Sequence, residues 1–403
     1  MTDEQNWQAP GARPAAGDGA PAYGSPPYPY QQPPQPYQQP QPYQQPQQGW
    51  APPPPQPAWA PPPQPGLVPL RPLGFGTLIG APFQVIRRNP KVTVGAALLI
   101  HGLPTLVATL LVTSGAAFLL DRAINSSANY RGALAAGAVG GVIVLGLLGA
   151  VISGVAGALL QGVIVGEVAR GTVGEKLSFR SLWNLVKGRV GALIGWTFLI
   201  TLAWIVLAAL VVLPLAGLAS LGPAGIGAAI ILAVLAFVGI LALAVWFSTK
   251  AALVPSAIVL ERLPVRAALP RSWRLTRGYF WRTFGIIALI GVIVYAVTQI
   301  VSTPFAILGS LIGGILAPTS SSAGQNSAFA QLLVSQFSVN ILATVVTSIV
   351  GAVLAVVQTS AVALIYIDLR MRKEGLDLQL TRFVEARQAG QDVTDPFLGP
   401  PTA

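Results

Sequence analysis

The stretch VTVGAALLIHGLPTLVATLLVTSGAAFLL, residues 92–120, contains no acidic residue, lysine or arginine. A helix needs about 20 predominantly apolar residues to cross the hydrocarbon core of a bilayer. The apolar residues here are continuous, whereas the strands of a membrane barrel alternate between apolar and polar residues. The stretch therefore predicts a membrane-spanning helix.

Five similar apolar runs follow, at about 134–166, 190–217, 224–254, 284–316 and 337–367. Charged residues make up 9% of the chain, whereas soluble proteins carry about 25%. We therefore predict an all-α polytopic membrane bundle with about six transmembrane helices. Prolines inside the first, third and fifth runs are expected to kink or end their helices; they are Pro104, Pro214 and Pro304.

The cations are sorted between alternate segments of the chain. Of the 24 lysines and arginines, 22 lie before the first run, between the second and third, around the linker between the fourth and fifth, or after the sixth. The other segments hold only Arg122 and Arg131. By the positive-inside rule we expect both termini to be cytoplasmic. We expect the protein to be a multi-pass protein of the plasma membrane. The net charge of +11 then indicates contact with anionic lipid headgroups rather than nucleic acid.

The apolar runs are flanked by two polar tails. Residues 1–66 are rich in proline, glutamine and tyrosine, and we predict a disordered cytoplasmic tail that is either a docking strip for a protein partner or a solvated segment with no fixed partner. This N-terminus shows no cleavable signal peptide, so the first run is expected to serve as an uncleaved insertion signal. The predicted membrane domain spans 67–385, and 386–403 are predicted to be a flexible C-terminal tail.

A basic, aromatic motif recurs before the odd-numbered runs. RSWRLTRGYFWRTFG, residues 271–285, resembles WNLVKG at 183–188 and, more weakly, FQVIRR at 83–88. We predict three units, each a basic interfacial helix followed by a two-span hairpin. Pro270 favours a helix that starts at Arg271. The motif is either a plain topology anchor or a lipid-binding collar, and its candidate headgroup contacts are Arg87, Arg88, Trp183, Lys187, Arg271, Trp273, Arg274 and Arg277.

Residues for catalysis or cofactor binding are not apparent. His101 is the only histidine, there is no cysteine, and none of the thirteen acidic residues lies in the middle of an apolar run. The chain shows no phosphate-binding glycine loop and no nucleophile elbow. We therefore predict no catalytic, cofactor-binding or metal-ligating residue. His101 is expected to bond a carbonyl freed by Pro104.

Three stretches resemble a known family. RPLGFGTLIGAPFQVIRRNP (71–90), LERLPVRAALPRSWRLTRGYFWRTFGI (260–286) and IYIDLRMRKEGLDLQL (365–380) are similar to actinobacterial multi-span proteins named after the membrane domain of glycerophosphoryl diester phosphodiesterase. Enzymes with this domain also carry a catalytic barrel with clustered histidines, which this chain lacks. The resemblance thus implies a membrane domain without that activity.

These observations predict a non-enzymatic integral membrane protein that acts as a scaffold or lipid-interacting module. The alternative is a transporter or lipid flippase with a groove between helical hairpins. A third possibility is a membrane subunit for a soluble partner recruited by the N-terminal tail.

Overall fold

The computed structural model describes residues 66–124, 126–316, 341–391 and 393–398. Within these ranges the chain forms helices and no strand. Six of the described helical segments are long and apolar enough to cross a membrane, which confirms the all-α prediction. These segments are Pro90–Ile124, Gly132–Thr172, Phe179–Ala219, Pro223–Leu260, Phe280–Leu311 and Ala343–Glu374.

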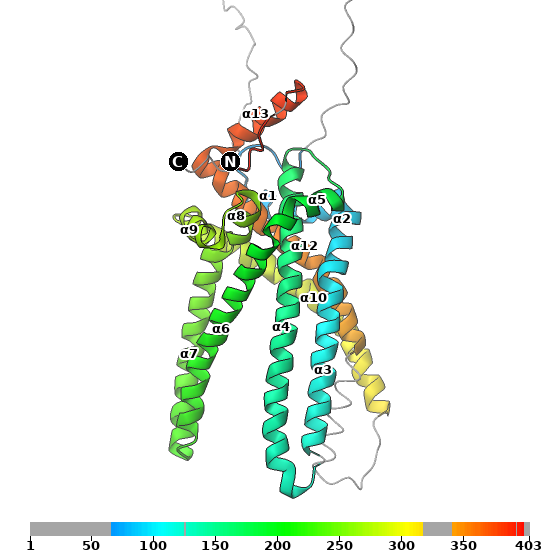
Figure 1. The fold of residues 1–403 in the computed structure, drawn as a ribbon, viewed down its shortest axis with the longest axis vertical. Coiled ribbons are helices and arrows are strands. Elements are labelled where there is room, and N and C mark those ends of the chain that lie inside the picture. Colours follow the sequence, from blue (N-terminus) through cyan, green and yellow to red (C-terminus); the bar gives the residue numbers. More distant parts are fainter. Residues whose placement is uncertain (1–65, 125, 317–340, 392, 399–403) are drawn as a thin grey trace, which may run out of the picture. The chain divides into compact units, whose positions relative to one another are not determined.

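The apolar segments are built from long helices joined to shorter ones (Figure 1). In chain order the helices are α1 (Phe75–Arg88), α2 (Pro90–Ala96), the π-helical turn η1 (Ala97–Gly102), α3 (Leu103–Ile124), α4 (Ala128–Thr172), α5 (Phe179–Val186), the 3-10 turn η2 (Lys187–Arg189), α6 (Val190–Ala219), α7 (Pro223–Ala251), α8 (Val254–Leu260), α9 (Val265–Thr276), α10 (Phe280–Leu316), α12 (Ile341–Glu374) and α13 (Leu376–Gln388).

The long helices pack as three hairpins: α3 with α4, α6 with α7, and α10 with α12. The short helices α1, α5 and α9 each precede one hairpin, as the sequence repeat predicts. Helices α1, α5, α8, α9 and α13 lie toward one end of the long helices (Figure 1), which we call the basic end because the motif cations lie there. Pro214 and Pro304 lie inside α6 and α10, so neither helix ends at its proline.

Helix α12 lies at the centre of the bundle and contacts α1, α3, α4 and α10. In an apolar 18-residue stretch of this helix, 50% of the residues are buried, whereas at most 11% are buried in the corresponding stretches of the other five segments. By contrast, α6 and α7 present large apolar side chains outward, among them Leu210 and Phe237. So much exposed apolar surface is unfavourable in water and suits a hydrocarbon environment.

Helix α9 does not begin where the sequence predicted. It starts at Val265 and continues through Pro270, so the predicted start at Arg271 is wrong. A proline inside a helix removes one backbone donor and costs about 3 kcal/mol. Burial of Ala268 and Leu275 on either side of the proline offsets this cost, since both are at most 1% exposed.

The chain around His101 also differs from expectation. His101 lies in the π-turn η1, directly before α3 and its Pro104. Its Nδ1 is buried and has no hydrogen-bond partner among the described residues, so no bond from this nitrogen to a freed carbonyl is present. The π-turn changes the backbone hydrogen-bond register just before Pro104. The carbonyl to which the sequence predicted that His101 would bond therefore lies in a different backbone arrangement.

Part of the predicted flexible C-terminal tail is packed. Helix α13 extends to Gln388, and the ring of Phe397 is only 1% exposed. The Phe397 carbonyl accepts a hydrogen bond of 3.0 Å from Arg370 Nη1. The prediction of a flexible tail is therefore wrong for this segment, because a buried aromatic ring and a charge-assisted bond hold it on α12. The predicted disordered tail, residues 1–66, lies outside the described residues apart from Gly66.

Candidate functional site

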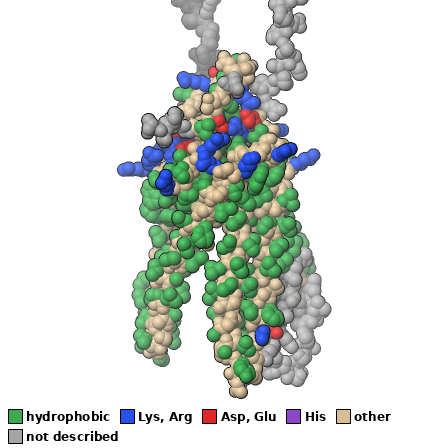
Figure 2. Space-filling model, viewed as in Figure 1, with side chains coloured by type: hydrophobic (Ala, Val, Ile, Leu, Met, Phe, Trp, Pro, Cys, Tyr) green, Lys and Arg blue, Asp and Glu red, His purple; other side chains and the backbone are tan. Residues whose placement is uncertain are grey.

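The charged side chains gather at the basic end of the bundle. Figure 2 shows blue lysine and arginine side chains in a band there, with acidic side chains among them. Several of the described cations at this end are exposed, and we call them the basic collar: Arg87, Lys91, Lys187, Arg266, Arg274 and Arg277.

One ion-pair cluster joins α8, α9 and α12. Arg271 Nε and Nη2 lie 2.9 Å and 2.8 Å from the two oxygens of Glu261, and Nη2 also donates to Glu374 at 2.7 Å. Tyr366 donates its hydroxyl to Glu261, and Arg370 Nε lies 3.0 Å from Glu374. The cluster links residues 261 and 374 through a single guanidinium, so it holds the loop after α8 against the end of α12.

Electrostatics in this cluster favour the charged form of Arg271. Burial by itself lowers the pKa of this guanidinium, because an apolar environment disfavours charge. Hydrogen bonds and the charges of Glu374 and Glu261 act in the opposite direction and outweigh burial, so the pKa is raised above its ordinary value. Arg271 is therefore a fixed cation of the structure.

A second cluster surrounds Asp368, whose side chain is 1% exposed. Its Oδ1 accepts a bond of 2.8 Å from the backbone amide of Leu73, and Arg282 and Arg372 pair with the carboxylate at 3.1 Å and 3.0 Å. Both guanidinium groups also donate to the Leu73 carbonyl at 2.7 Å. The segment before α1 is thus tied to α10 and α12 by one buried carboxylate.

A third cluster closes the end of α4. Asn89 Nδ2 donates to Glu167 Oε1 and to the Leu177 carbonyl, both at 3.1 Å. Arg88 donates to the Gly171 carbonyl at 2.8 Å. Arg170 pairs with Asp395, which connects α4 to the segment before Phe397.

The structure divides the six cations among the eight predicted headgroup contacts into two groups. Arg87, Lys187, Arg274 and Arg277 are exposed. Arg88 and Arg271 instead bond to groups of the protein, and the Arg271 side chain is 15% exposed.

The two predicted tryptophans are half-buried beside aromatic partners. Trp183 stacks on Phe179 with ring centroids 6.3 Å apart, and Trp273 meets Trp246 edge to face at 5.0 Å. Lys250 Nζ lies 5.7 Å from the Trp273 ring. An aromatic ring that is partly buried and partly exposed near cations is typical of residues at a membrane interface.

Sequence reasoning missed the buried partners in these clusters. Asp368 with Arg372 and Arg370 with Glu374 are spaced four residues apart, which is the spacing of ion pairs on one helix face. This spacing is a signal that was present in the sequence. The bonds of Leu73 with Asp368 and of Arg271 with Glu374 have no local signature.

Six apolar helical segments within the described residues, with α12 at their centre and cations gathered at one end, define a polytopic α-helical membrane protein. The chain belongs to a family described as a domain of unknown function, DUF7847, which matches residues 76–369. No curated protein and no solved structure matches the chain.

Proposed function

We propose that the protein is a non-enzymatic plasma-membrane protein that binds anionic lipids through the basic collar. In this proposal the basic end faces the cytoplasm, where anionic headgroups are found. The resemblance to the membrane domain of glycerophosphoryl diester phosphodiesterase is part of this proposal. The activity of that enzyme's catalytic barrel is not.

The basic collar is the observation that carries this proposal. Its six cations are exposed beside the ends of apolar helices, with Trp183 and Trp273 half-buried nearby. Each cation near an anionic surface contributes about 1 kcal/mol. Six of them therefore favour anionic over neutral headgroups, with an effect that decreases as salt is added.

The buried charges support a structural role rather than a catalytic one. Glu261, Asp368 and Arg370 are each engaged by side chains or backbone groups of the protein. Breaking such buried pairs is costly. These groups therefore hold the basic end together and leave the exposed cations for a ligand.

Lipid retention tests the proposal directly. The full chain is purified from membranes, and bound phospholipids are identified by native mass spectrometry. The variant Arg87→Gln/Arg274→Gln/Arg277→Gln should retain less anionic lipid, whereas Arg122→Gln, near the opposite end of α3, should behave as the wild type. Equal retention by both variants would reject the proposal.

The alternative function, lipid or solute transport between hairpins, has one observation in its favour. An apolar cleft lies between α4 of the first hairpin and α6 of the second. Its lining is apolar apart from two threonines, which suits a lipid chain better than a hydrophilic solute. Transbilayer movement of a fluorescent phospholipid in proteoliposomes would distinguish transport from static binding.

A further inference from the structure

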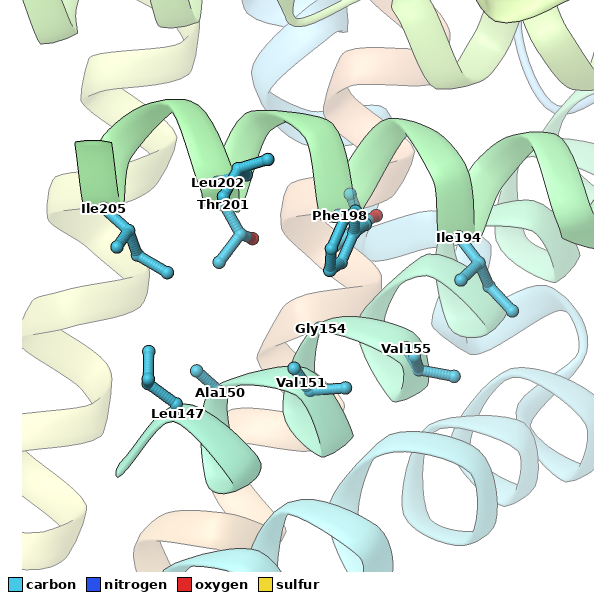
Figure 3. A pocket seen from close by; sticks show the side chains of 11 residues that line it. Leu147, Ala150, Val151, Gly154, Val155, Ile194, Phe198, Thr201, Leu202 and Ile205 are labelled. Atoms are coloured by element: carbon cyan, nitrogen blue, oxygen red, sulfur yellow. The ribbon is translucent and has the colours of Figure 1, made fainter. Parts of the chain in front are cut away.

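The cleft between α4 and α6 is formed by facing apolar side chains (Figure 3). Its cavity volume is about 100 Å³, and the cleft is partly open to the surroundings. Ile194, Phe198 and Ile205 point into it from α6, and Leu147 and Val151 face them from α4. A space of this kind inside a bilayer would forfeit dispersion contacts if it were empty, so an apolar chain is the expected occupant.

Small residues determine where the cleft begins. A Cβ at Gly162 would lie 2.6 Å from Val186 Cγ1 and 2.9 Å from Leu193 Cδ1, so α4 touches the end of α5 and the start of α6 there. At Gly154 the corresponding distance to Thr197 Cγ2 is 3.1 Å. The contact at Gly162 therefore closes the cleft on the face of α6 that carries Leu193. From there the cleft extends away from the basic end, as an acyl chain does from its headgroup.

Two cations lie directly before α6. Lys187 and Arg189 form η2, Lys187 is exposed and Arg189 is half-buried. Neither forms an ion pair within the described part of the chain, and no acidic residue occurs anywhere between Glu175 and Glu261. Ile194 follows Arg189 by five residues, or about 7–8 Å along a helix.

The path from these cations to the cleft is open. Gly191 and Gly195 lie on α6 and have no atom within 4 Å of the position that a Cβ would occupy. Counting 100° per residue from Gly191, Gly195 lies near 40° and Phe198 near −20°, which puts the three on one face of α6. The lining from Ile194 to Ile205 then extends about 16 Å.

We propose that this cleft holds an acyl chain of a single anionic phospholipid whose headgroup binds Lys187 and Arg189. This site rests on the proposed function, since it assigns one lipid position to Lys187 of the basic collar and its neighbour Arg189. The charge complementarity selects an anionic headgroup, and the apolar lining selects its chain. A zwitterionic lipid would gain less from the two cations, because its own positive group lies beside its phosphate.

The experiment uses a phosphatidylglycerol probe with a photoreactive acyl chain, incorporated with the full chain into nanodiscs. Crosslinked peptides are then mapped by mass spectrometry. Labelling is expected within residues 147–155 and 194–205. Lys187→Gln/Arg189→Gln should reduce it by roughly fivefold for each charge removed.

Cleft-filling variants provide the second arm. Ala150→Phe places a ring in the cleft and should reduce labelling at α6, whereas Ala242→Phe, on an exposed position of α7, should not. Ala150→Leu is the milder version if the phenylalanine variant does not fold. The Lys187→Gln/Arg189→Gln variant changes residues outside the cleft. It therefore provides a test that does not depend on how the cleft side chains repack.

The outcomes separate the cleft site from the collar. Labelling that is equal with a phosphatidylcholine probe of the same chain would overturn the headgroup assignment. An unlabelled cleft in a protein whose collar still retains anionic lipid would overturn the site but leave the proposed function standing. Loss of lipid retention in the collar variant with cleft labelling unchanged would support the site while showing that the collar contributes separately.

Discussion

Asp368 accepts a hydrogen bond of 2.8 Å from the backbone amide of Leu73, a residue 295 positions earlier in the chain. The same carboxylate pairs with Arg282 and Arg372, so the start of the described chain, α10 and α12 meet at one buried charge. Removal of the charge leaves two guanidinium groups without their counter-ion.

Asp368→Asn is therefore expected to destabilise the folded protein strongly. Loss of one partner of a buried ion pair costs about 3–5 kcal/mol. Thermal unfolding of the purified protein in detergent measures the effect as a lower midpoint. Asp377→Asn, at a half-buried acid on α13, is the matched control and should change the midpoint little. Equal midpoints for the two variants would contradict a structural role for Asp368.

Arg271 and Arg274 should behave differently although they lie on one helix. Arg271→Gln breaks the bonds to Glu261 and Glu374 and should lower the unfolding midpoint with a small effect on lipid retention. Arg274→Gln removes an exposed cation and should reduce anionic-lipid retention without lowering the midpoint. If Arg271→Gln reduced lipid retention and Arg274→Gln lowered the midpoint instead, Arg271 would be the residue that binds lipid.

The charge of Arg271 should stabilise the protein evenly across neutral pH. Because its folded-state pKa is raised, the stability it contributes is fully present below the ordinary arginine pKa and is lost only as pH rises through the higher folded value. The difference in unfolding midpoint between wild type and Arg271→Gln should therefore be constant from about pH 6 to about pH 9. A difference that disappears toward the alkaline side of this range would contradict this reading.

Phe397→Ala tests the packed C-terminal segment. The ring is 1% exposed, and removal of a buried phenylalanine ring costs about 3–5 kcal/mol. We expect a lower unfolding midpoint and faster proteolytic cleavage after α13. Val393→Ala, at an exposed position four residues earlier, should leave both unchanged. Equally rapid cleavage of the wild type and of both variants would argue against the packed segment.

Gly162→Ala should destabilise the contact between α4 and the start of α6. Its new Cβ would lie under 3.0 Å from side chains of Val186 and Leu193, and such overpacking costs about 1–3 kcal/mol. Gly195→Ala meets open space and should be neutral or slightly stabilising, since alanine favours a helix by about 1 kcal/mol over glycine. The two unfolding midpoints provide the comparison, and a neutral Gly162→Ala would mean that the helices separate easily.

Membrane orientation can be tested with single cysteines, because the chain has none of its own. Ser127→Cys lies between α3 and α4, and Ser178→Cys lies between α4 and α5; both positions are exposed. An impermeant maleimide added to intact cells should label the first and not the second. The reverse pattern would place the basic end outside the cytoplasm.

The sequence by itself determined the helical class and the six apolar segments. These follow from local properties, since a continuous apolar run of sufficient length forms a helix in lipid whatever lies elsewhere in the chain. The spacing of Asp368 and Arg372 is local in the same sense and was also readable. The hairpin units follow from the repeat because each motif immediately precedes its own hairpin.

Only the tertiary structure decided which cations are bonded within the protein and which are exposed. Arg271 and Arg274 are three residues apart in one motif, yet only Arg271 meets Glu374, whose position depends on how α12 packs. The cleft between α4 and α6 and the burial of Phe397 have the same origin. Each depends on side chains far apart in the chain, whose contacts arise only when the helices pack together.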